Sequence, residues 1–333
     1  MKNSIRVKIL KYFLVSLIVI IVWNLLSLRQ LPESINYGVS FSKFHADELQ
    51  LNWKEVYRAI LDDLGVRQLR LIAHWPMIEP SAGKYNFAEL DYQIAEAQKR
   101  KADFILAIGR RLPGWPECHV PDFANTLSEG EQRQKILEMI KKIVLRYEDR
   151  PGLKYWQVEN EPFLSFFAKD HCAVPDEEFL KTEIELVRSL DSEHPILITD
   201  SGEFGTWYQA YRNADIFGSS MYLYVWSRVL GPIRYPIGAS FFRVKQKIIE
   251  MTYGQREKIL IELSAEPWLL HPIVDTPIET QLERMNIEKM EEIIKFAKNS
   301  GFEKQYLWGA EWWYWLKSKG QPEFWDFAKP LFK

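Results

Sequence analysis

The stretch YWQVENEPF, residues 155–163, decides how the rest of the chain is interpreted. Its first half is aromatic and β-branched, as expected of an extended strand in an apolar core. Glu159, Asn160 and Glu161 then follow in consecutive positions, and Pro162 ends the run. Because ionised carboxylates are costly to bury, this strand has to end where charged groups are tolerated.

Strand-like and helix-like segments alternate from residue 37 onward. The eight predicted strands are 37–42, 67–75, 103–109, 153–162, 195–204, 216–224, 258–263 and 305–315. Between most of them, apolar residues recur every three or four positions, as in helices that pack on one face. Eight such units predict an α/β fold, a (β/α)8 TIM barrel. An open doubly wound sheet is the alternative, but no Gly-x-Gly-x-x-Gly follows the first strand.

In such a barrel the carboxyl ends of the strands meet at one rim, where active sites are built. Glu161 ends the fourth predicted strand, and Glu262 ends the seventh in the run KILIELSAEPW, residues 258–268. The two side chains would therefore face each other across the mouth. Two carboxyl groups this close cannot both ionise cheaply, so the pKa of one is raised and it can act as an acid. Retaining glycosidases use such a pair, ~5–5.5 Å apart.

Asn160-Glu161-Pro162 after the fourth strand, with Glu262 after the seventh, resembles clan A of the glycoside hydrolases. These are (β/α)8 retaining enzymes that include cellulases, mannanases and β-galactosidases, and the resemblance covers most of the chain after residue 36. The segment HWPMIEPSAGKYNFAELD, residues 74–91, is similar to the stretch that follows strand two in the clan. GRRLPGWPECHVP, residues 109–121, resembles the loop after strand three of some cellulase-like members.

The resemblance implies a role for each matching residue. Glu161 would be the acid/base, and Glu262 would be the nucleophile. Asn160 would bind the 2-hydroxyl of the sugar at the cleavage point. Arg70 and Tyr222 would keep Glu262 ionised.

Three further predictions leave alternatives open. By the resemblance, a tryptophan near the end of strand eight, Trp308 or Trp312, would form the platform below the scissile sugar. Glu266 shares the strand parity of Glu262 and also precedes a proline, but we expect Glu262 to be the nucleophile because it is the first charged residue after the apolar run. Glu266 would then contact a sugar hydroxyl in a neighbouring subsite. His74, at the rim of strand two, would bind either a sugar hydroxyl or an ordinary protein partner.

The N-terminus is expected to form one hydrophobic helix that precedes the barrel. A basic segment, residues 1–11, leads into the apolar run YFLVSLIVIIVWNLLSL at 12–28, and a linker at 29–36 follows. The run has about the minimum length for spanning a bilayer, ~17 residues, and no Ala-x-Ala follows it. We therefore predict a single-pass signal-anchor in the cell membrane, with residues 1–11 in the cytoplasm and 37–333 as an extracytoplasmic catalytic domain. A cleaved signal peptide, which would release a secreted barrel, is the alternative.

Export changes the interpretation of the two cysteines, Cys118 and Cys172, which both lie in loop-like sequence. An oxidising compartment permits a disulfide between them, and two free thiols are the alternative. Neither cysteine has zinc-motif spacing, and the six histidines are scattered singly, so we predict no metal and no other cofactor.

The bulk composition limits the classes of partner. A net charge of −2 without a clustered basic face argues against nucleic acid, and 14% aromatic residues fit either a large core or sugar-stacking surfaces. The resemblance to clan A implies a retaining hydrolase whose substrate is a β-linked oligo- or polysaccharide, and we expect a monomer. A transglycosylase on the same scaffold, a glycan-binding barrel without activity and a metal-dependent barrel hydrolase are the alternatives.

Overall fold

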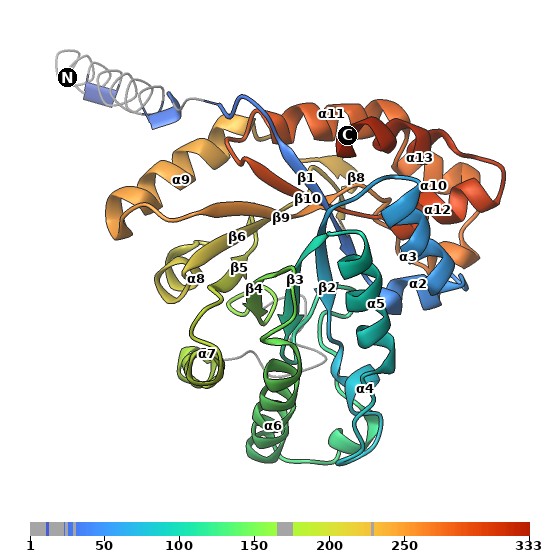
Figure 1. The fold of residues 1–333 in the computed structure, drawn as a ribbon. Coiled ribbons are helices and arrows are strands. Elements are labelled where there is room, and N and C mark those ends of the chain that lie inside the picture. Colours follow the sequence, from blue (N-terminus) through green and yellow to red (C-terminus); the bar gives the residue numbers. More distant parts are fainter. Residues whose placement is uncertain (1–10, 13–22, 24–25, 29–30, 165–175, 228–229) are drawn as a thin grey trace.

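Figure 1 presents a computed structural model that describes residues 11–12, 23, 26–28, 31–164, 176–227 and 230–333. Eight parallel strands close into a barrel in the order β1-β10-β9-β6-β5-β4-β3-β2. The strands are β1 (Asn36–Phe41), β2 (Gln68–Ile72), β3 (Asp103–Ile108), β4 (Leu153–Val158), β5 (Ile196–Asp200), β6 (Ile216–Met221), β9 (Lys258–Ser264) and β10 (Lys304–Trp308). The predicted barrel is therefore confirmed.

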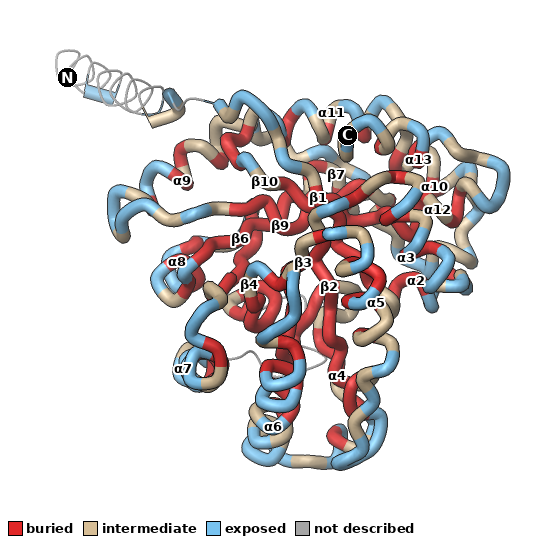
Figure 2. The backbone as a smooth tube through the Cα atoms, viewed as in Figure 1, coloured by how far each residue is buried: buried red, intermediate tan, exposed pale blue. Residues whose placement is uncertain are grey.

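Helices surround the barrel, and Figure 2 shows their outer faces exposed while the strands are buried. The helices are α2 (Lys43–Glu48), α3 (Trp53–Asp62), α4 (Trp75–Ile78), α5 (Ala88–Lys99), α6 (Glu129–Tyr147), α7 (Glu177–Leu190), α8 (Tyr208–Asn213), α9 (Ala239–Tyr253), α10 (Ile278–Arg284), α11 (Ile287–Lys298), α12 (Ala310–Ser318) and α13 (Glu323–Ala328). Residues Ile105, Leu197, Ile216, Ile259, Ile261 and Tyr306 form a separate buried apolar cluster contributed by barrel strands. The barrel interior is thus a packed core, as is usual for this architecture.

Several predicted strands extend too far, and the causes are clearest for the fourth and the eighth. β4 ends at Val158, because Glu159 and Glu161 have φ values of 58° and 46°, which an extended chain cannot have. β10 ends at Trp308, since Gly309 has φ 123° and α12 begins directly after it. The prediction of a strand over 305–315 is therefore wrong beyond Trp308, because a short apolar run fits a buried helix as well as a strand.

A two-stranded antiparallel sheet follows β6 and was not predicted. It consists of β7 (Tyr224–Ser227) and β8 (Gly231–Arg234), with Val225 opposite Ile233. Because β6 ends at Met221, the hairpin stands at the carboxyl ends of the barrel strands. It therefore adds side chains to the end of the barrel where active sites are built.

The predicted N-terminal helix at 12–28 lies mostly outside the described residues. Among the helices that are described, none has the length and apolar character that a membrane crossing requires. The signal-anchor therefore stays a prediction.

We predict that Gly38→Ala destabilises the barrel. A Cβ at this position on β1 would lie 2.7 Å from the Tyr306 ring and 2.8 Å from the carbonyl oxygen of Gln68. Overpacking of this kind costs ~1–3 kcal/mol of the free energy of unfolding, which urea denaturation would measure.

Gly130→Ala is the matched control. Nothing lies within 4 Å of a Cβ at Gly130 in the first turn of α6, so this variant should be as stable as the parent or up to ~1 kcal/mol more stable. Equal losses in both variants would contradict the packing of Gly38 against Tyr306.

Candidate active site

Arg70 on β2 is a completely buried cation that joins the ends of two other strands. Its Nη1 donates to Glu262 Oε2 at 2.7 Å, and its Nη2 donates to Asn160 Oδ1 at 2.7 Å. Its Nε donates to Gln157 Oε1 at 2.8 Å. A buried charge is tolerated only when it is paired and hydrogen-bonded, so these contacts fix the carboxylate and the amide relative to each other.

Glu262 lies on β9 and is 4% exposed. Arg70 binds one of its oxygens, and the hydroxyl of Tyr222 donates to the other. Burial and the negative charge of Glu262 raise the pKa of Tyr222 well above its ordinary value, so this hydroxyl keeps its proton and acts as a donor. Glu262 is thus in direct contact with both Arg70 and Tyr222, the two residues that the resemblance assigned to it.

Glu161 follows β4 and reaches the same end of the barrel. Its backbone N–H donates to Thr199 Oγ1 on β5 at 2.8 Å, which holds the turn with φ 46° in place. Burial, followed by the negative charges of Glu117 and Glu262, raises the pKa of Glu161 well above its ordinary value. The raised pKa favours the protonated form of Glu161, which is the form that an acid requires.

The neighbours of Glu161 in the sequence are equally constrained. The Oδ1 atom of Asn160 accepts from Arg70, which leaves the amide nitrogen as the group that can contact a ligand. The carboxylate of Glu159 accepts from the backbone N–H groups of Arg110 at 2.8 Å and Arg111 at 2.5 Å. Glu159 thus ties the end of β4 to the loop that follows β3.

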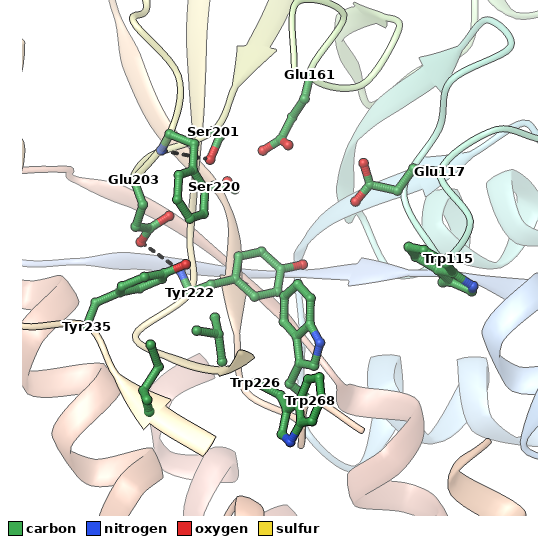
Figure 3. A pocket seen from close by; sticks show the side chains of 13 residues that line it. Trp115, Glu117, Glu161, Ser201, Glu203, Ser220, Tyr222, Trp226, Tyr235 and Trp268 are labelled. Atoms are coloured by element: carbon green, nitrogen blue, oxygen red, sulfur yellow. Dashed lines mark hydrogen bonds between the residues drawn. The ribbon is translucent and has the colours of Figure 1, made fainter. Parts of the chain in front are cut away.

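A cavity of about 330 Å³ lies beside Glu161, at the carboxyl ends of the strands. Figure 3 shows Glu161, Glu117 and the hydroxyl group of Tyr222 all directed into it. Most of the remaining wall is aromatic or aliphatic. The lining residues are Trp115, Glu117, Glu161, Ser201, Glu203, Phe204, Ser220, Tyr222, Val225, Trp226, Ile233, Tyr235 and Trp268. Such a cavity, mostly apolar with a few polar groups, is typical of a ligand site.

Sequence reasoning missed two carboxyl groups of this cavity. Glu117 stands in the loop after β3, and Glu203 stands in the loop after β5, where its Oε1 accepts from the backbone N–H of Tyr222 at 2.9 Å. Burial raises the pKa of each to about 7. Glu203 lies at the carboxyl end of the predicted fifth strand, 195–204, and this position was the one signal that could have identified it.

His74 is not among the residues that line the cavity. It is 1% exposed, its Nε2 lies 3.0 Å from the carbonyl oxygen of Pro113, and its ring lies 4.3 Å from the ring of His119. Burial, followed by the neighbouring His119, lowers the pKa of His74 well below its ordinary value, so the ring is neutral and donates to Pro113. Of the two alternatives for His74, the structure has the protein partner.

Glu266 is held by two aromatic side chains. Its Oε1 accepts from Trp308 Nε1 at 2.7 Å, and its Oε2 lies 2.8 Å from His45 Nε2. Although burial lowers the pKa of His45, the Glu266 carboxylate raises it well above the ordinary value. Glu266 has neither Arg70 nor Tyr222 as a partner among the described residues, and those two contacts belong to Glu262.

The two candidate platform tryptophans differ in position. Trp308 ends β10 and is 6% exposed, and its ring stacks on His45 with centroids 5.8 Å apart. Trp312 lies on α12, is fully buried, donates to Gln281 Oε1 at 2.7 Å and packs on Phe324. Of the two alternatives, Trp308 therefore remains the candidate platform, because the ring of Trp312 is part of the core.

The structure describes only one of the two cysteines of the predicted disulfide. Cys118 in the loop after β3 is disulfide-bonded. Cys172, the other cysteine of the sequence, lies outside the described residues. Within the described ranges, no group of three or more His, Cys, Asp or Glu side chains could hold a metal ion.

Known proteins resemble this chain in sequence. A glycoside hydrolase family 42 model, described as beta-galactosidase, matches residues 47–195. Beta-galactosidase LacZ of Lactobacillus acidophilus is 24% identical over 137 residues, and BgaA of Clostridium cellulovorans is 24% identical over 190 residues. The alignments cover 36% and 52% of this chain but only 20% and 28% of those proteins. The matched model range includes Arg70, Asn160 and Glu161 and ends before Tyr222 and Glu262.

Solved structures extend the likeness to most of the barrel. GH5_18 from Bifidobacterium longum has a TM-score of 0.59 at 14% identity, covering 83% of this chain and 70% of that one. A beta-galactosidase from Halorubrum lacusprofundi has a TM-score of 0.52 at 15% identity, covering 82% and 52%. The family model thus matches the first half of the barrel, and the solved structures show that most of the chain has the same fold, a closed eight-stranded barrel.

Proposed function

We propose that this protein is a retaining glycoside hydrolase that cleaves O-glycosidic bonds in a β-linked glycan. The observation that carries the proposal is the hydrogen bonding of Arg70 to both Glu262 and Asn160, the residue before Glu161. Glu262 thereby has a cationic partner, whereas Glu161, which lines the cavity, has a raised pKa. Two carboxyl groups in such contrasting environments suit the roles of nucleophile and acid.

The proposed reaction has two steps. Glu262 attacks the anomeric carbon while Glu161 gives its proton to the glycosidic oxygen, so the aglycone leaves as an alcohol and the sugar becomes an ester of Glu262. Glu161, now ionised, takes a proton from water, and the resulting nucleophile displaces Glu262 from the anomeric carbon. The sugar leaves with its original anomeric configuration, and both carboxyl groups regain their starting protonation states.

The relatives support β-linked substrates in general terms. The curated relatives are named beta-galactosidases, and one GH5_18 structure contains the disaccharide Manβ1-4GlcNAc. The aromatic wall of the cavity suits the apolar faces of sugar rings. A binding protein without activity would not need the raised pKa of Glu161, so this feature favours the enzyme.

We predict that a 2-deoxy-2-fluoro β-glycoside with a good leaving group labels Glu262. The fluorine slows the second step more than the first, so the ester accumulates and peptide mass spectrometry identifies its residue. Glu262→Gln should remain unlabelled under the same conditions. A label on Glu266 would contradict the assignment of the nucleophile.

The pH dependence should report Glu161. Because the acid must be protonated and its pKa is raised, kcat/KM should hold at neutral pH and fall as the pH rises through that raised pKa. In Glu161→Gln this decrease at high pH should vanish, and kcat/KM should drop by ~10²–10⁴-fold for substrates with poor leaving groups. An unchanged basic limb in the variant would mean that another group is the acid.

We also propose that residues 12–28 hold the barrel at the outer face of a membrane. The basic segment before the apolar run supports this orientation. The full chain should then stay with membranes in alkaline carbonate, whereas a chain that starts at residue 30 should be released. Release of the full chain, still carrying residues 12–28, would exclude the anchor.

A further inference from the structure

Glu117 is, with Glu203, one of two carboxyl groups in the lining of the cavity that the reaction proposed above does not use. It follows Trp115 and Pro116 in the loop after β3, and its φ of 59° is one that residues with a side chain rarely adopt. Its backbone N–H donates to the carbonyl oxygen of Gly114 at 2.6 Å. A side chain held by such a backbone points to a functional constraint.

Two buried histidines contact backbone carbonyl groups of this loop. The rings of His74 and His119 lie 3.0 and 3.1 Å from the carbonyl oxygens of Pro113 and Gly114, respectively. Burial lowers the pKa of both histidines, that of His119 to about 4, so both rings are neutral and can donate one hydrogen bond each. The loop that carries Glu117 is therefore fixed before any ligand binds.

One oxygen of the Glu117 carboxyl group lacks a partner within the described part of the chain. Its Oε2 atom is buried and accepts no hydrogen bond there. Figure 3 shows the group directed into the cavity, across from Glu161. An unpaired buried acceptor destabilises the protein unless a ligand or water supplies the missing donor.

The charges around the cavity define what that donor can be. Burial, then the charge of Glu262, raises the pKa of Glu117, while Arg111 and Arg70 oppose the rise. The Nη atoms of Arg70 and the Nη2 atom of Arg111 donate to other protein groups, whereas Arg111 Nε is buried and has no partner among the described residues. The described lining of the cavity contains no lysine or arginine. A hydroxyl group of a ligand can therefore supply the missing donor to Glu117.

We propose that Glu117 binds the substrate, its carboxylate accepting a hydrogen bond from a hydroxyl group of the sugar that lies between Glu161 and Glu262. This inference rests on the proposed glycosidase function and adds to it a residue that selects which sugar binds. A sugar without that hydroxyl would leave Glu117 unpaired, and a site built to bind a hydroxyl rejects such analogues strongly.

The test compares 4-nitrophenyl β-galactoside, β-glucoside and β-mannoside with their monodeoxy analogues, using the full chain and its Glu117→Gln and Glu117→Ala variants. For the preferred parent sugar, kcat/KM should fall ~10- to 100-fold in the variants, since a hydrogen bond to a charged group is lost. For one monodeoxy analogue it should change by less than ~3-fold, because that bond is already absent. Equal losses for every analogue, or no loss for any, would overturn the proposal.

Glu203→Gln is the matched control from the same cavity. Its carboxylate has a protein partner, the backbone N–H of Tyr222, so its substitution should affect all analogues by the same factor. Glu55→Gln, on the exposed surface of α3, should leave every value unchanged. Thermal unfolding of each variant separates misfolding from a lost contact, and Glu117→Gln retains the size of the side chain if Glu117→Ala does not fold.

Binding separates this inference from the proposed reaction. Calorimetry of the same glycosides with Glu161→Gln, and with Glu161→Gln combined with Glu117→Gln, measures affinity without turnover. If the parent protein hydrolyses none of them but the Glu117 substitution still weakens binding selectively, the glycosidase proposal fails and the Glu117 contact stands. If the Glu117 substitution does not change the selectivity of binding, the proposed Glu117 contact is wrong, whether or not the parent protein is active.

Discussion

A single buried cation sets the geometry of this site. The guanidinium group of Arg70 donates to side chains from β4, from the turn after β4 and from β9. In the barrel order, β2 is separated from β9 by β1 and β10, and from β4 by β3, so these bonds cross the barrel interior. Because an unpaired guanidinium there would be very costly, the barrel can close only with Glu262 and Asn160 at the same mouth.

The same cation creates a chemical difference between two glutamates. Glu262 receives Arg70 and the Tyr222 hydroxyl, whereas Glu161 is surrounded by burial and by the negative charges of Glu117 and Glu262. Glu262 thus has a cationic partner, whereas the raised pKa of Glu161 favours its protonated form, and such a contrast is how neighbouring carboxyl groups acquire separate roles. Glu117 belongs to this balance, since its charge helps to keep the proton on Glu161.

The barrel and the centre of the site could be predicted because both follow from strand patterns. A polar residue that ends an apolar run must lie at the rim, and this rule identified Glu161 and Glu262. The same reasoning failed where chain direction changes without a periodic signal. Gly309 turns the chain into a helix and buries Trp312, and the loop carrying Glu117 acquires its shape from long-range contacts such as the one between His74 and Pro113.

The central claim is that the carboxyl groups of Glu161 and Glu262 act on opposite sides of one sugar at the short separation of ~5–5.5 Å that a covalent intermediate requires. Proton NMR of the first product formed from a β-linked substrate tests it most directly. The account predicts that the β anomer appears first and only later equilibrates with the α anomer. Initial formation of the α anomer would contradict it, because water would then attack directly between carboxyl groups ~6.5–9.5 Å apart.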